Sequence, residues 1–187
     1  AQTLTHDLQA LTQDGHLSVR YFEQAVTEPA PGQEESPEEA AEELFRQMRL
    51  NFGFESVARL HGNIGYIDLH AFARPQHAGE RLVAAMDLLA DTKALIIDLR
   101  KCGGGDPDTV KLFASYLFDE RTHLNDIYWR DENRTEERWT QDSVPGKKYG
   151  AARKLYLLTS ADTFSGGEDF AYALKNNGRA TLVGETT

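Results

Sequence analysis

The chain has 187 residues, 40% hydrophobic and 27% charged, so it is long enough to bury a core of its own. Its formal net charge of −10 argues against a nucleic-acid-binding protein, which would normally present a basic face. The single cysteine, Cys102, excludes an internal disulfide framework, and no apolar run approaches the length of a membrane span.

The N-terminal region, residues 1–52, is predicted to be mainly helical. Leucines three to four residues apart predict a first helix over residues 1–13. The sequence Asp14-Gly15-His16 breaks this helix and sets the imidazole of His16 on a tight turn. A short extended segment is expected to follow, over residues 17–22.

A connector rich in proline and glutamate, residues 28–36, leads into a second predicted helix. Ser36 is followed by Pro37 at the first helical position and by Glu39 three residues on, a combination that typically starts a helix. Apolar residues at helical spacing extend this helix to about Leu50. We interpret the acidic stretch, residues 34–39, as a solvated segment that leads into the helix and not as a docking site for basic partners.

The remainder, residues 53–187, alternates between predicted strands and helices. Alternation of this kind implies parallel strands joined by right-handed crossovers. The predicted fold class is therefore α/β, with a mainly parallel sheet flanked by helices. In chain order we expect a hairpin of strands 57–60 and 64–69, a helix over 78–90, a strand over 94–97 that is buried on both faces, a helix over 108–118, an exposed hairpin over 124–140, a second buried strand over 155–158, a helix over 164–174 and a strand over 180–183.

Two turns that follow predicted strands are candidates for a site, because open α/β sheets bind ligands at the carboxyl ends of their strands. The first contains three successive glycines, residues 103–105, and is called the glycine turn; its backbone N–H groups can approach a ligand closely. The second, the serine turn (residues 159–168), places Ser165 between a strand and a helix. Both turns leave the same sheet, so we expect them to converge.

Ser165 has two interpretations. A serine at a helix N-terminus usually caps the helix. Alternatively, Ser165 is a nucleophile whose oxyanion is met by the Gly166 N–H and by N–H groups of the glycine turn, while Thr163 or Asp162 caps the helix. The local sequence resembles the Gly-x-Ser-x-Gly elbow only loosely, since Thr163 stands at the first glycine.

A serine nucleophile needs a general base. His70 ends a predicted strand and is compatible with either a surface or a site position. His16 is distinctive because of its tight turn, although such turns are more often purely structural. The remaining histidines lie in polar segments or in a turn: His6, His77, His123 and His61.

Five segments, taken together and in order, resemble the tail-specific protease family, which includes the C-terminal processing peptidases, the tricorn protease core and interphotoreceptor retinoid-binding protein. Each segment is weak alone, but the ordered set is specific and covers about residues 8–187. The segments are 14–18 (DGHLS), 64–67 (IGYI), 96–100 (IIDLR), 163–170 (TFSGGEDF) and 178–186 (GRATLVGET).

This resemblance implies a ClpP/crotonase-like core and a serine peptidase that hydrolyses peptide bonds through an acyl-enzyme, with no cofactor and no metal. Ser165 would be the nucleophile, and the backbone N–H groups of Gly166 and Gly104 would hold the oxyanion. His16 matches the early-turn histidine that tricorn-like members use as the base. Processing peptidases use a lysine instead, at a position that would lie beyond Thr187. The substrate implied is a peptide or protein.

The chain also departs from the family pattern. Cys102 stands where the family usually has an asparagine, which alters the hydrogen bonding available to the glycine turn. A catalytic or redox role for this thiol is disfavoured, because nothing in the sequence lowers its pKa. The segment between His16 and Ile64 is too short for a PDZ domain, so the chain resembles the PDZ-less branch.

Other interpretations stay open. The retinoid-binding relatives suggest a non-catalytic module for a lipid-like ligand (a retinoid or fatty acid) or a peptide tail, and a crotonase-type acyl-CoA enzyme is a weaker alternative. We expect the chain to be part of a longer protein of bacterial origin, periplasmic or secreted in preference to cytoplasmic. Neither a nucleic acid nor a membrane span is expected, and an oligomer is compatible with the sequence.

Overall fold

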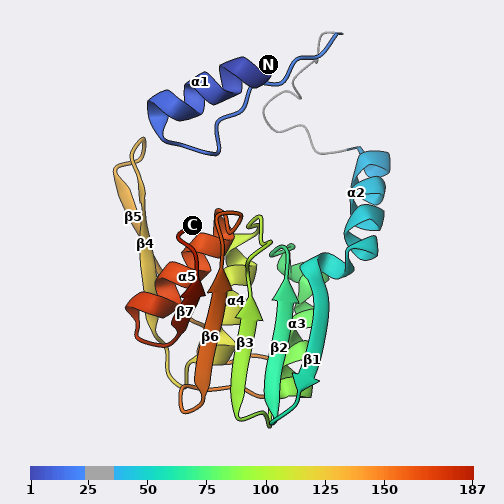
Figure 1. Ribbon diagram of the computed structural model, residues 1–187, viewed down its shortest axis with the longest axis vertical. Coiled ribbons are helices and arrows are strands. Elements are labelled where there is room, and N and C mark those ends of the chain that lie inside the picture. The colour runs from blue at the N-terminus through green and yellow to red at the C-terminus, as the bar shows by residue number, and fades with distance from the viewer. Residues whose placement is uncertain (24–35) are drawn as a thin grey trace. The chain divides into compact units, whose positions relative to one another are not determined.

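The computed structural model describes residues 1–23 and 36–187 (Figure 1). Contacts between residues divide the chain into two compact units, Ala1–Glu39 and Ala40–Thr187, and each is described by itself. The predicted connector lies outside the described residues except for Ser36, its last residue.

The first unit contains helix α1, Gln2–Thr12, in agreement with the sequence prediction. Gln13 closes the helix in a left-handed conformation, with a φ of 57°. The chain then folds back on the helix, because Thr5 Oγ1 accepts a hydrogen bond of 2.8 Å from the backbone N–H of Val19. Residues 17–22, all of them described, form no strand.

Helix α2, Pro37–Arg49, begins with the capping arrangement that the sequence predicts. The Ser36 N–H donates to Glu39 Oε2 at 3.0 Å, and the Glu39 N–H donates to Ser36 Oγ at 3.2 Å. These two bonds satisfy backbone donors that a helix N-terminus otherwise leaves unpaired.

The second unit is built on a five-stranded sheet with the order β1-β2-β3-β6-β7. β1 runs antiparallel to β2, and the other strands are parallel, which confirms the predicted α/β class with a mainly parallel sheet. The predicted hairpin of β1 and β2 also forms. The strands are β1 (Phe54–Leu60), β2 (Ile64–Leu69), β3 (Ala94–Asp98), β6 (Lys154–Thr159) and β7 (Thr181–Gly184).

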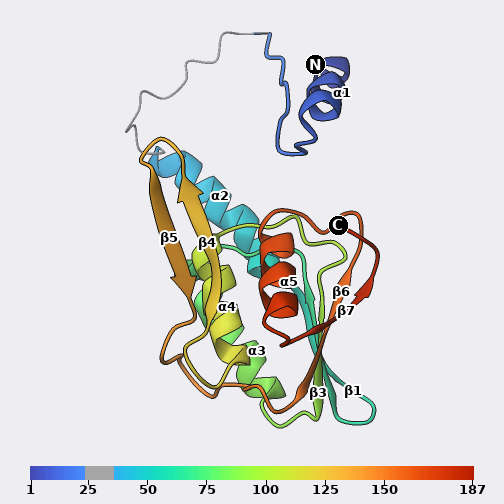
Figure 2. The same cartoon turned by 90° about the vertical axis from the view of Figure 1, so that its left-hand side faces the viewer.

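Three helices pack on one face of this sheet (Figures 1 and 2): α3 (Pro75–Leu89), α4 (Pro107–Leu117) and α5 (Gly166–Asn176). A short 3-10 helix, Asn51–Gly53, precedes β1. The core lies between sheet and helices, where residues such as Ile97 and Phe170 are fully buried. No helix of the described residues is both long and apolar enough to cross a membrane.

The second hairpin, β4 (His123–Trp129) and β5 (Arg134–Trp139), forms a separate two-stranded sheet, as predicted. It lies on the side of α5 that faces away from the large sheet and extends past the N-terminal end of this helix (Figure 2). The hairpin therefore stands at the same edge of the unit as the carboxyl ends of the parallel strands.

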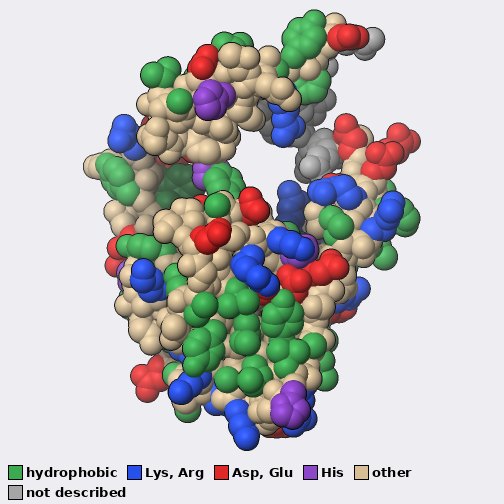
Figure 3. Space-filling model, in the orientation of Figure 1, with side chains coloured by type: hydrophobic (Ala, Val, Ile, Leu, Met, Phe, Trp, Pro, Cys, Tyr) green, Lys and Arg blue, Asp and Glu red, His purple; other side chains and the backbone are tan. Residues whose placement is uncertain are grey.

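The prediction that β3 is buried on both faces is wrong, and β6, predicted as a second buried strand, is likewise fully buried on one face only. Their core-facing residues, such as Leu95 and Leu157, are fully buried, whereas Ile96 and Tyr156 on the opposite face are only partly buried. The physical reason is that α3, α4 and α5 all lie on the same side. Apolar side chains consequently gather over the sheet on the open face (Figure 3).

Candidate active site

The glycine turn and the serine turn meet at the carboxyl edge of the sheet. A Cβ placed on Gly104 would lie 2.8 Å from the Gly166 nitrogen and 2.8 Å from Ser165 Cβ. Gly104 also has a φ of +93°, a conformation that residues with a side chain rarely adopt. The absence of a side chain at this position is therefore what lets the two turns come together, and the structure thus brings together three of the residues predicted for the site.

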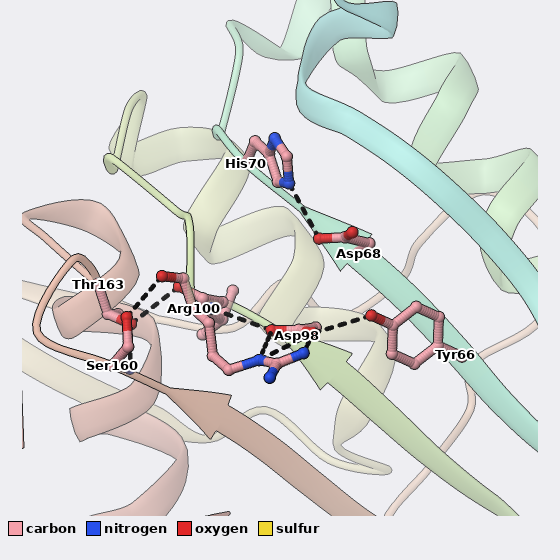
Figure 4. A network of polar contacts seen from close by, with 8 residues as sticks. Tyr66, Asp68, His70, Asp98, Arg100, Ser160 and Thr163 are labelled. Carbon is pink, nitrogen blue, oxygen red and sulfur yellow. Dashed lines mark hydrogen bonds and ion pairs between the residues drawn. The ribbon is translucent and has the colours of Figure 1, made fainter. Parts of the chain in front are cut away.

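Hydrogen bonds from the serine turn to residues 99–102, which lead into the glycine turn, fix the relative positions of the two turns. The Phe164 N–H donates to the Cys102 carbonyl at 2.9 Å, and Thr163 Oγ1 donates to the Leu99 carbonyl at 2.8 Å. Ser160 Oγ donates to the Arg100 carbonyl at 2.6 Å (Figure 4). The N-cap residue of α5 is Ser165, so the expectation that Thr163 or Asp162 would cap this helix is wrong.

Ser165 itself occupies the N-cap position of α5, with a φ of 52° and a ψ of −114°. This backbone conformation is sparsely populated for residues other than glycine and costs about 1–3 kcal/mol. It is held in part by Glu168, whose Oε2 accepts a hydrogen bond of 2.7 Å from the Ser165 N–H. The sequence predicted Ser165 but gave no role to Glu168.

The glycine turn is fixed on its other side to the chain that follows β2. Phe72 donates its N–H to the Gly104 carbonyl at 2.8 Å and accepts from the Asp106 N–H at 2.6 Å, which makes an isolated parallel bridge between Phe72 and Gly105. In such a bridge the middle residue points its own N–H away from the partner strand. The Gly105 N–H is thus directed away from Phe72, and its nitrogen lies 3.1 Å from the position of a Cβ on Gly166.

Cys102 lies under this turn and is completely buried. Burial raises the pKa of its thiol to about 11, against a smaller lowering effect of the Gly104 N–H. A thiol with this pKa is almost entirely protonated at neutral pH and is a poor nucleophile. The geometry therefore agrees with the sequence argument against a catalytic or redox thiol.

We expect Cys102 to resist modification by 5,5′-dithiobis(2-nitrobenzoate) in the native protein at pH 8, because the reagent needs an exposed thiolate. One equivalent of thiol should react once the protein is unfolded in guanidinium chloride. Rapid stoichiometric reaction of the native protein, followed at 412 nm, would contradict the burial and the raised pKa.

A polar network covers the end of β3 (Figure 4). Asp98 accepts hydrogen bonds from Tyr66 Oη at 2.8 Å and from Arg100 Nη2 at 2.6 Å. Burial acts to raise the pKa of Asp98, but the hydrogen bonds from Arg100 and Tyr66 outweigh it and hold the pKa below its usual value. The network fixes Arg100, whose carbonyl holds Ser160 of the serine turn.

His70 directly follows β2 beside the glycine turn, and its carbonyl accepts a hydrogen bond of 3.0 Å from the Gly103 N–H. Its Nε2 lies 3.1 Å from Asp68 Oδ1, and both side chains are partly exposed. Figure 4 shows this pair on the strand next to the one that carries Asp98. His70 thus lies within ion-pair distance of a carboxylate, although its Nε2 makes no hydrogen bond of good geometry.

His16 belongs to the first unit and Ser165 to the second, so the role of His16 as a base stays a prediction. Within its own turn, His16 is well defined: its Nδ1 lies 2.9 Å from Asp14 Oδ1, which also accepts the His16 backbone N–H at 2.9 Å. The backbone N–H and then the imidazole of His16 lower the pKa of Asp14. A carboxylate on Nδ1 selects the tautomer in which Nε2 can accept a proton.

Comparisons with known proteins place these residues in a family. A family model described as peptidase family S41 matches residues 63–187, a range that contains both turns and begins after His16. Three solved structures share the fold. A candidate peptidase from Parabacteroides merdae is 19% identical over 75% of this chain and 47% of its own, with a TM-score of 0.54.

The other two are a photosystem II D1 C-terminal processing protease and a candidate S41 protease from Bacteroides fragilis. The first is 22% identical over 71% of this chain and 34% of its own, with a TM-score of 0.53. The second is 19% identical over 69% of this chain and 36% of its own, with a TM-score of 0.55. This chain therefore spans less than half the length of each of these three proteins. It belongs to peptidase family S41.

Proposed function

We propose that this chain provides the nucleophile and the oxyanion hole of a serine peptidase that hydrolyses peptide bonds through an acyl-enzyme. The observation that carries the proposal is the position of Ser165, in a strained turn at the N-terminus of α5 and packed directly against Gly104. Strained backbone of this kind is concentrated at functional sites. Membership of a peptidase family supports the same reaction.

In the proposed reaction Ser165 Oγ attacks the carbonyl carbon of the scissile bond. Negative charge then develops on the carbonyl oxygen, next to the first N–H of α5, which belongs to Gly166, and to the N–H of Gly105, which the bridge with Phe72 leaves unused. The Gly104 N–H, expected from the sequence to be a donor, faces the Cys102 thiol instead. Backbone donors aimed at developing charge are effective because they need no reorganisation, and each is typically worth about 10²–10³ in rate. The positive end of the α5 dipole acts in the same direction.

We propose His16 as the general base that takes the Ser165 proton. The contact between its Nδ1 and Asp14 supports this role, because the carboxylate would fix the tautomer and stabilise the imidazolium. The same imidazole would then protonate the leaving amine. A peptide or protein is the proposed substrate.

A fluorophosphonate probe tests the proposal on the full-length protein. The probe forms a bond from an activated serine Oγ to phosphorus and releases fluoride, so it reports the nucleophile without a peptide substrate. We expect one label per chain, located by mass spectrometry on Ser165, and none on Ser160 of the same turn. A His16→Ala variant should be labelled much more slowly, and unfolded protein not at all.

Labelling on another serine would contradict the assignment of Ser165. A wild-type protein that takes no label and hydrolyses no casein would contradict the peptidase and favour a binding module. Normal labelling of the His16→Ala variant would assign the base to another residue.

A further inference from the structure

A buried arginine joins the two helices that follow the two turns of the site. Arg138, on β5, is 8% exposed. Its Nη2 donates to the Pro107 carbonyl at 2.5 Å, and its Nη1 donates to Asp169 Oδ2 at 2.9 Å. Pro107 is the first residue of α4, and Asp169 lies in the first turn of α5. One guanidinium therefore spans the N-termini of both helices.

Each contact of Arg138 reaches one half of the candidate site. Pro107 directly follows Asp106, whose N–H is bonded to Phe72 in the bridge that fixes the glycine turn. Asp169 donates its own N–H to the Ser165 carbonyl at 2.9 Å. The guanidinium is thus connected to the glycine turn through the start of α4 and to the serine turn through the start of α5.

The carboxylate that receives Arg138 is itself held in place. Asn125, which pairs with Arg138 across the β4–β5 hairpin, donates its Nδ2 to Asp169 Oδ1. Both carboxylate oxygens of Asp169 are therefore occupied by donors from the same hairpin. Charge-assisted bonds of this kind are short and directional, and a pair with a buried arginine and a partly buried carboxylate is screened less than a surface pair.

We propose that Arg138 is a positioning residue that fixes the position of the serine turn relative to the glycine turn. This inference rests on the proposed function. Arg138 touches no reacting atom and acts through Pro107 and Asp169. The planar guanidinium suits this task, since its fixed fork donates in two directions at once, whereas a lysine ammonium is a point charge on a flexible stem.

The relative position of the two turns matters because each turn supplies part of the proposed oxyanion hole. A displacement of about 1 Å between reacting groups costs about 10²-fold in rate. We therefore expect Arg138→Lys, which keeps the charge and loses the fork, to slow phosphonylation of Ser165 by roughly 10- to 100-fold. For peptide hydrolysis, kcat should fall by a similar factor with little change in KM, because the variant removes no substrate contact.

Arg179 provides a matched control in the same chain. It is also 8% exposed, and it donates to two backbone carbonyls, Nε to Leu117 at 2.5 Å and Nη2 to Gly150 at 2.7 Å. Leu117 is the last residue of α4, so this arginine acts at the opposite end of that helix from the site. Arg179→Lys should lower the melting temperature about as much as Arg138→Lys while leaving the phosphonylation rate within about two-fold of wild type.

The experiment measures the second-order rate constant of phosphonylation, kcat, KM and the melting temperature for the full-length wild type and both variants. Phosphonylation that is slow in Arg138→Lys and close to wild type in Arg179→Lys supports the inference. Equal rates for the two variants would overturn it and leave the peptidase assignment intact. An unreactive wild type would overturn the peptidase assignment and this inference with it. If Arg138→Lys fails to fold, Asp169→Asn, which keeps the shape and removes the charge, replaces it with the same criteria.

Discussion

Replacement of Ser165 by alanine is expected to abolish hydrolysis while leaving the fold intact. We expect casein hydrolysis by the full-length protein to fall by about 10³-fold or more, since removal of a serine nucleophile eliminates the acyl-enzyme route. Circular dichroism and the melting temperature should stay close to wild type, because the change removes one oxygen at an N-cap position, which usually costs about 1 kcal/mol. Hydrolysis that persists in this variant would contradict the assignment.

A second substitution at the same position separates catalysis from backbone strain. Glycine adopts the positive φ of Ser165 without the penalty that a side chain incurs, whereas alanine keeps that penalty. Both variants should be inactive, but Ser165→Gly should be more stable than Ser165→Ala by about 1 kcal/mol in urea denaturation. The opposite order would show that the turn around Ser165 is relaxed.

Replacement of Gly104 by alanine is expected to have the second largest effect. The new methyl group would lie 2.8 Å from both the Gly166 nitrogen and Ser165 Cβ, so the turns must separate. The positive φ adds about 1–2 kcal/mol of strain. We expect phosphonylation of Ser165 to slow by at least about 10²-fold, since both nucleophile and oxyanion donors are displaced.

Gly103→Ala is the matched control for this experiment. A Cβ on Gly103 meets no atom within 4 Å, and its φ lies outside the positive region. This variant should keep its phosphonylation rate within about three-fold of wild type and lose no more than about 0.5 kcal/mol of stability, as is usual for open positions. If Gly104→Ala behaved like Gly103→Ala, the close contact between the two turns would not matter for the reaction.

Local patterns in the sequence predicted most of the fold. The spacing of apolar residues identified the helices and strands of the second unit, and the Ser36, Pro37 and Glu39 combination located the start of α2. The alternation of strands and helices predicted a mainly parallel sheet, and parallel strands bring their carboxyl ends to one edge. The convergence of the glycine and serine turns followed from that topology.

Features that depend on distant residues were not predictable in the same way. A continuous apolar run such as residues 94–97 does not reveal how many layers cover the strand, so the burial of β3 on both faces was wrongly expected. Thr163 was one of two alternatives to Ser165 for the helix cap, although its hydroxyl bonds to Leu99, 64 residues earlier in the chain. The contact between Arg138 and Asp169 joins a hairpin to a helix, and no local pattern indicates it.

The β4–β5 hairpin also has a practical use, because it is bonded to the rest of the unit at its base and not at its tip. Its base is bonded to α4 and α5, whereas Arg130, Asp131, Glu132 and Asn133 at its tip are exposed. Exposed loop tips with polar residues tolerate insertions best. A short affinity tag or a fluorophore introduced between Asp131 and Glu132 should therefore leave the contacts of Arg138 with α4 and α5 unchanged.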